Sequence, residues 1–261
     1  MAALCLFAIL ACLAFWVVRD IRQYRLFKAT TDSIVRQRYY LSWTVQSFVL
    51  LVGLSAITAA VLGRDLPLLT LPPEFRELAA ASSPPDQGSD SEEGRFGMAI
   101  GFALGLGIAV AVHVWRMRRA MTAMLGDVDS MIPRNRREIL AALPLCLNAG
   151  FSEELFFRLA LPLLIASVTG SVLIGLAASA VIFGLIHLYQ GWKGVIATMV
   201  AGVVLTVIYL QSGSLIRPML LHALMDVLAL VVRPALSARF GAAGRGSAAR
   251  LTRCDAAVGR P

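Results

Sequence analysis

Residues 149–162 read AGFSEELFFRLALP and place three charged side chains in a segment that is otherwise apolar. The charged residues are Glu153, Glu154 and Arg158. An ionised side chain near the centre of a bilayer costs roughly 2.5–3.5 kcal/mol on insertion scales, so such residues indicate a functional site with polar partners. The polar candidates on the later apolar segments are His187, His222 and Asp226.

The composition around this segment is that of an integral membrane protein. Of the 261 residues, 58% are hydrophobic and 15% are charged, whereas soluble domains are about 25% charged. The net charge is +8, but the basic residues lie in short stretches beside apolar runs, as the positive-inside rule predicts. We therefore expect an all-α, polytopic bundle of membrane helices in the lipid bilayer, and no nucleic-acid partner.

Seven apolar segments are long enough to be transmembrane helices. They cover approximately residues 1–18, 41–62, 96–115, 138–168, 171–189, 194–210 and 214–232. Between them, residues 19–40 and 116–137 are expected to form basic loops, and the acidic, proline-rich residues 64–95 a disordered outer loop. Within the fourth segment, Pro144 and the sequence Asn148-Ala149-Gly150 predict a kink or an interfacial first half before Glu153.

The distribution of basic residues predicts the orientation and the domains. Lysine and arginine concentrate in residues 19–40, 116–137 and 233–261, which indicates an outside N-terminus and a cytoplasmic C-terminus in the cell membrane. We expect three parts. They are N-terminal helices in residues 1–137, a catalytic membrane core in residues 138–232, and a disordered basic tail in residues 233–261.

The spacing of the charged residues predicts different roles for the two glutamates. Residues four apart share one face of a helix, so Glu154 and Arg158 are expected to form an ion pair. Glu153 diverges from Glu154 by about 100° and has no basic partner on its own helix. Glu153 is therefore the carboxylate that is available for chemistry.

The later segments supply the groups that could work with Glu153. His187 follows Phe183 by one helical turn, and His222 and Asp226 share a face of the last segment. If the four C-terminal helices gather these groups around a water-filled cavity, the cavity holds a base, an imidazole partner and groups for an oxyanion. Such a site can add water to an amide carbonyl. Glu153, His187 and His222 could also hold a zinc ion, so the cofactor is left open between zinc and none.

These motifs, in this order, resemble the CPBP family of intramembrane proteases, which includes the CaaX-processing endopeptidases and the bacteriocin-immunity (Abi) proteins. The motifs are Glu-Glu-x-x-x-Arg from Glu153, Phe-x-x-x-His from Phe183 and His-x-x-x-Asp from His222. The resemblance covers about residues 138–232. It implies an intramembrane endopeptidase that acts on a membrane-associated polypeptide.

The resemblance also implies residue roles. Glu153 and His187 would activate the attacking water, and His222 and Asp226 would stabilise the oxyanion. The residues expected to support the site are Glu154, Arg158 and Phe183. Asp226 stands where the CaaX endopeptidases have asparagine, and an ionised aspartate would repel an oxyanion. It must therefore be protonated, orient His222 or bind a metal, and the family has been described both as metalloproteases and as glutamic proteases.

Two other functions use the same residues. A proton- or ion-coupled transporter would use the glutamate, histidine and aspartate side chains as a relay. A non-catalytic immunity or scaffold protein would keep the fold without turnover. The absence of an internal repeat argues against the transporter, and the complete set of polar residues argues against the scaffold. The oligomeric state is left open.

Overall fold

A computed structural model describes residues 1–82 and 129–232, and every regular element in these ranges is a helix. The longer helices are α1 (Ala2–Ala29), α2 (Ser33–Leu62), α5 (Arg136–Glu154), α7 (Val172–Ile186), α8 (Gly191–Ser212) and α9 (Ile216–Val227). The shorter elements are α3 (Pro73–Ser82), α6 (Leu161–Thr169), the 3-10 turns η1 (Asp129–Met131) and η3 (Leu188–Gln190), and the π-helical turns η2 (Leu155–Ala160) and η4 (Leu228–Val232).

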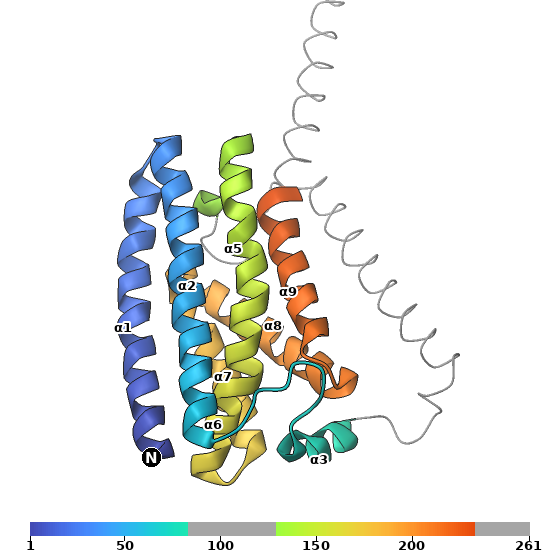
Figure 1. Cartoon of the computed structure of the whole chain (residues 1–261). Coiled ribbons are helices and arrows are strands. Elements are labelled where there is room, and N and C mark those ends of the chain that lie inside the picture. Colours follow the sequence, from blue (N-terminus) through green and yellow to red (C-terminus); the bar gives the residue numbers. More distant parts are fainter. Residues whose placement is uncertain (83–128, 233–261) are drawn as a thin grey trace, which may run out of the picture.

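The predicted polytopic helical bundle is confirmed. Three helical stretches among the described residues are long and apolar enough to cross a membrane: α1, α2 and Leu188–Ser212. In Figure 1, α2 packs between α1 and α5, and α9 lies on the other side of α5. The predicted span at residues 96–115 and the predicted tail at 233–261 lie outside the described residues.

The predicted basic loop at residues 19–40 is wrong, because this segment is mostly helical. α1 continues to Ala29, and only residues 30–32 connect it to α2. Residues 19–29 contain neither proline nor glycine, so nothing in them interrupts a helix. Asp32 then caps α2, and its carboxylate accepts hydrogen bonds from the backbone N–H groups of Ile34 (2.7 Å) and Val35 (3.3 Å).

Part of the predicted disordered loop at residues 64–95 is also ordered. Pro73 begins α3, at a position where the missing N–H of proline costs nothing. Phe75 is fully buried, and its ring lies 6.1 Å from the ring of Tyr209 on α8. This apolar contact fixes α3 against the bundle, and residues 83–95 lie outside the described part of the chain.

Of the kink or interfacial first half predicted before Glu153, the interfacial alternative is wrong as well, and the kink stays a prediction. α5 runs from Arg136 to Glu154 through Pro144, and it packs along α2 and α9. The side-chain amide of Asn148 donates to the carbonyl oxygen of Thr44 (3.2 Å) and to the hydroxyl of Ser47 (2.8 Å). Asn148, a residue type that is common at helix breaks, therefore joins α5 to α2.

Gly150 lies at a close approach of α5 and α9. A Cβ atom at Gly150 would lie 2.6 Å from the carbonyl oxygen of Met219 and 2.7 Å from Cβ of Ala223. We expect Gly150→Ala to lower the free energy of unfolding by about 1–3 kcal/mol, because two helix backbones would have to separate. The control is Gly53→Ala, where no atom lies within 4 Å of the new Cβ. Unfolding in detergent micelles measures both variants, and equal stability of the two would contradict the prediction.

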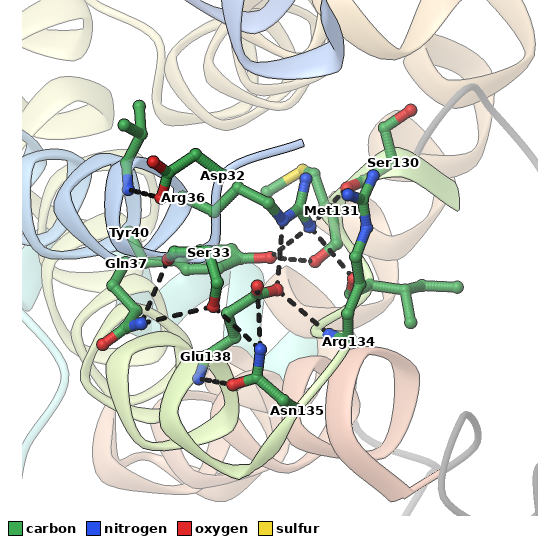
Figure 2. Close-up of polar contacts among 12 residues, drawn as sticks. Asp32, Ser33, Arg36, Gln37, Tyr40, Ser130, Met131, Arg134, Asn135 and Glu138 are labelled. Atoms are coloured by element: carbon green, nitrogen blue, oxygen red, sulfur yellow. Dashed lines mark hydrogen bonds and ion pairs between the residues drawn. The ribbon is translucent and has the colours of Figure 1, made fainter. Parts of the chain in front are cut away.

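A buried polar cluster joins the start of α2 to the start of α5 (Figure 2). Arg36, which is fully buried, donates from Nε to Glu138 (3.0 Å). Its Nη2 donates to the Tyr40 hydroxyl (3.0 Å) and to the carbonyl oxygens of Ser130 (2.9 Å) and Ile132 (3.1 Å). Arg36 was expected in the basic loop at residues 19–40. It instead fixes the chain that leads into α5.

Candidate active site

The site begins where α5 passes into the π-helical turn η2. A π turn leaves a carbonyl without its usual helical partner, and such turns are frequent at functional sites. The hydroxyl of Ser179 on α7 donates to the carbonyl oxygen of Phe157 (2.5 Å), which satisfies a buried acceptor in this turn. Glu153 and Glu154 end α5, and Arg158 lies within η2.

The predicted ion pair between Glu154 and Arg158 is confirmed. Nε of Arg158 lies 3.1 Å from Oε2 of Glu154, and both side chains are almost completely buried. The guanidinium of Arg158 also lies 4.1 Å from the ring centroid of Phe183, a cation–π contact. Gly202 on α8 leaves room for this ring, since a Cβ there would lie 2.9 Å from Phe183. Phe183 therefore packs between the buried pair and α8.

Glu154 makes a second contact that spacing in the sequence did not predict. Its Oε1 lies 2.7 Å from Nδ1 of His222 on α9. The carboxylate, paired with Arg158, is the acceptor, so Nδ1 of His222 donates and the other ring nitrogen, Nε2, is left for the site. The two residues are 68 positions apart, and no local pattern could show this pairing.

Loss of the Glu154 carboxylate should affect both the fold and His222. We expect Glu154→Gln to lower the free energy of unfolding by about 3–5 kcal/mol, because Arg158 would be left buried without its counter-charge. The exposed Glu77 on α3 provides the control, Glu77→Gln, which should change stability by less than about 0.5 kcal/mol. Detergent unfolding and the 15N shifts of the His222 ring measure the two effects, and an unchanged His222 spectrum in folded Glu154→Gln would contradict its role in orienting the ring.

Glu153 faces both histidines. Its Oε2 lies 3.9 Å from Nε2 of His187 and 3.9 Å from Nε2 of His222. This oxygen is buried and has no hydrogen-bond partner among the described residues. A separation of 3.9 Å is too long for a direct hydrogen bond, but one water molecule between the groups can bond to all of them.

A backbone carbonyl fixes which ring nitrogen of His187 carries the proton. Nδ1 of His187 lies 2.8 Å from the carbonyl oxygen of Phe183. A carbonyl oxygen only accepts, so Nδ1 carries the proton and, in the neutral ring, Nε2 is a bare acceptor. Two acceptors, Nε2 and the Glu153 carboxylate, therefore face each other, and a water molecule between them can donate to each.

α7, which ends directly before His187, is short for a membrane-spanning helix. α7 has 15 residues, about 22 Å of helix, and a bilayer core is about 30 Å thick. The chain therefore turns back at His187 inside the bundle and continues through η3 into α8. This short helix lets His187 reach Glu153 although α5 places that residue deep in the bundle.

Asp226 lies at the edge of the group. Its Oδ2 is 3.9 Å from Nε2 of His222, and its side chain is 36% exposed, against 14% for Glu153. Asp226 makes no direct hydrogen bond to Nε2 of His222 at this distance. The structure thus brings the four predicted site residues together, with Glu153 and His222 at the centre.

A cavity with a water-accessible volume of about 100 Å³ borders Glu153 and His187. The C-terminal helices supply the candidate catalytic residues, as predicted, but α1 and α2 supply another wall. The residues on that wall include Leu13, Trp16, Asp20, Tyr24, Trp43 and Ser47. Asp20 was not singled out in the sequence, because the first span was expected to end at residue 18.

The donor spacing does not match a metal site. In residues 1–82 and 129–232, no three His, Cys, Asp or Glu side chains are placed to hold a metal ion. Tetrahedral zinc with bonds of about 2.0–2.1 Å sets its ligands roughly 3.3–3.4 Å apart, whereas Glu153 Oε2 is 3.9 Å from each imidazole nitrogen. We therefore derive no step through a metal.

Comparison with known proteins identifies one family. Residues 135–228 match the family model described as Type II CAAX prenyl endopeptidase Rce1-like. Neither a curated protein nor a solved structure matches the chain.

Proposed function

Residues 135–228 place this chain in the CAAX-protease (CPBP) family, and from that membership we propose that Glu153 and His187 activate the water with which this membrane-embedded protease cleaves a peptide bond. The observation that supports this mechanism is the buried, unpartnered Oε2 of Glu153, which lies 3.9 Å from two imidazole nitrogens. A water molecule held there donates to two acceptors and keeps a lone pair for attack.

In the proposed reaction, the water oxygen forms a bond to the peptide carbonyl carbon while Glu153 takes a proton from the water. His187 accepts the other hydrogen bond and orients the nucleophile. The carbonyl oxygen becomes an oxyanion, the C–N bond then breaks, and the proton held by Glu153 passes to the leaving amine nitrogen. No covalent enzyme intermediate is required.

The oxyanion would be stabilised by His222. Nδ1 of His222 donates to Glu154, so Nε2 can donate only when the ring carries both protons. The carboxylates of Glu153, Glu154 and Asp226 lie within 3.9 Å of ring nitrogens and balance that charge. In this arrangement Asp226 acts on His222 and does not contact the oxyanion.

The substrate would be a membrane-associated polypeptide that reaches the cavity from the cytoplasmic end of the bundle. Figure 1 shows the α1–α2 connection and the start of α5 at one end, opposite the N-terminus. Basic side chains cluster in the part of α1 nearest this end: Arg19, Arg22, Arg25 and Lys28. The positive-inside rule assigns such an end to the cytoplasm, and Met131, close to it, lines the cavity.

Reconstitution tests this function against transport. Purified protein in proteoliposomes should cleave peptides from a membrane-associating library, prenylated CaaX peptides included, into two fragments that mass spectrometry detects. The same vesicles should show no solute flux when a pH gradient is imposed. A flux that depends on Glu153, without cleavage, would replace the proposal with a transporter.

Removal of metals should leave the reaction intact. The donor spacing described above requires no bridging ion, so we expect cleavage to change by less than about twofold, a difference of about 0.4 kcal/mol, after dialysis against a strong chelator. Elemental analysis of the dialysed protein is the control that metals are gone. Loss of cleavage that zinc restores would contradict the proposed water activation.

A further inference from the structure

The wall of the cavity formed by α1 carries a carboxylate that the proposed reaction does not use. Asp20 lines the same cavity as Glu153 and His187. Its Oδ1 is buried and has no hydrogen-bond partner among the described residues. The indole of Trp16, one turn earlier, is a hydrogen-bond partner of this carboxylate. One carboxylate oxygen is thus held in place and the other is available.

The surroundings of Asp20 suit a positively charged group. Aromatic side chains border the cavity on this side: Trp16, Tyr24, Trp43 and Tyr189. The described residues that line the cavity include two carboxylates, Asp20 and Glu153, and neither lysine nor arginine. Aromatic faces and carboxylates both attract cations, and the attraction strengthens where water is scarce.

Arg19 is the basic residue closest to Asp20 in the sequence. Its guanidinium carbon lies 5.0 Å from the ring centroid of Trp16, so this ring already accepts one cation. Arg19 does not line the cavity, whereas Asp20 does. A basic group that enters the cavity would therefore meet Asp20 at a wall to which Arg19 does not contribute.

We propose that Asp20 and the surrounding aromatic side chains form a subsite that binds a lysine or arginine side chain of the substrate. This inference rests on the proposed function. Asp20 is nine residues before Ala29 and Glu153 is 17 residues after Arg136, and these helix ends lie at the same level in Figure 1. At 1.5 Å per residue, Glu153 is about 12 Å deeper, a length of about three to four extended residues.

The basic residue should therefore lie three or four positions from the cleaved bond. The test uses the peptide that reconstituted protein cleaves fastest, resynthesised with lysine or glutamine at each of positions two to five on either side of that bond. We expect kcat/KM for lysine to exceed that for glutamine by at least about tenfold at one of these positions, as a charge-assisted hydrogen bond provides. In Asp20→Asn this ratio should fall to near one, and in the control Glu77→Gln it should be retained.

The outcomes separate this inference from the proposed function. No cleavage of any peptide by the unaltered protein would overturn both. Cleavage without a lysine preference would overturn the subsite alone. A decrease of equal size for lysine and glutamine peptides in Asp20→Asn, with the ratio retained, would also overturn the subsite and assign Asp20 to the chemistry.

Discussion

Glu153→Gln should lower the rate of peptide cleavage by a factor of about 10²–10⁴, the usual contribution of a general base. An amide has the shape of the carboxylate but cannot take a proton from the water between Glu153 and the two histidines. The fold should be unaffected, because Oε2 of Glu153 has no hydrogen-bond partner among the described residues to lose. Cleavage in proteoliposomes, with unfolding in detergent as a second measurement, checks both statements.

The control for Glu153→Gln makes the same chemical change elsewhere. Glu77 is exposed on α3, and Glu77→Gln should leave both cleavage and stability unchanged. If Glu153→Gln cleaved at the rate of this control, Glu153 would not be the base. If it failed to fold, the carboxylate would have a structural role that its contacts do not reveal.

Arg36→Met should lower the free energy of unfolding by about 3–5 kcal/mol. The change leaves Glu138 buried without its ionic partner, and it removes the donor to Tyr40, Ser130 and Ile132 (Figure 2). Because this cluster fixes the chain before α5, its loss should also loosen Met131 at the cavity wall. Unfolding in detergent micelles measures the stability change.

A double variant separates the ion pair from the other contacts of Arg36. Arg36→Met with Glu138→Leu removes both charges, so it should be more stable than Arg36→Met alone, although the lost bonds to backbone carbonyls prevent full recovery. Arg38→Met, at an exposed position two residues away, is the matched control and should change stability by less than about 0.5 kcal/mol. Equal stabilities of Arg36→Met and Arg38→Met would contradict the account of the cluster.

The sequence was sufficient to predict the helical class and the local pairing in the site. Membrane helices follow from composition, since the bilayer permits few other structures. The pair of Glu154 with Arg158 follows from a spacing of four residues on one helix. Contacts between distant segments could not be read this way, and the bond from Glu154 to His222 depends on how α5 crosses α9 at Gly150.

The wrong predictions for residues 19–40 and for the segment before Glu153 have a common cause. Each relied on a residue type that occurs both in loops or helix breaks and in packed helices. Arginine near an apolar segment usually marks a loop, but Arg36 is buried, and its guanidinium donates to Glu138 and to three other oxygens. Asparagine and glycine usually break helices, but Asn148 and Gly150 join α5 to its neighbours. In both cases a partner from a distant part of the chain decides whether the residue lies in a loop or within a packed helix, and the local sequence does not contain that partner.

The water between Glu153 and the histidines is the centre of the mechanism, and an experimental structure at a resolution that shows water tests it most directly. We expect one ordered water within about 2.6–3.2 Å of Oε2 of Glu153, Nε2 of His187 and Nε2 of His222. A structure in which Glu153 bonds directly to a side chain, or in which the three groups lie too far apart to share one water, would contradict the account.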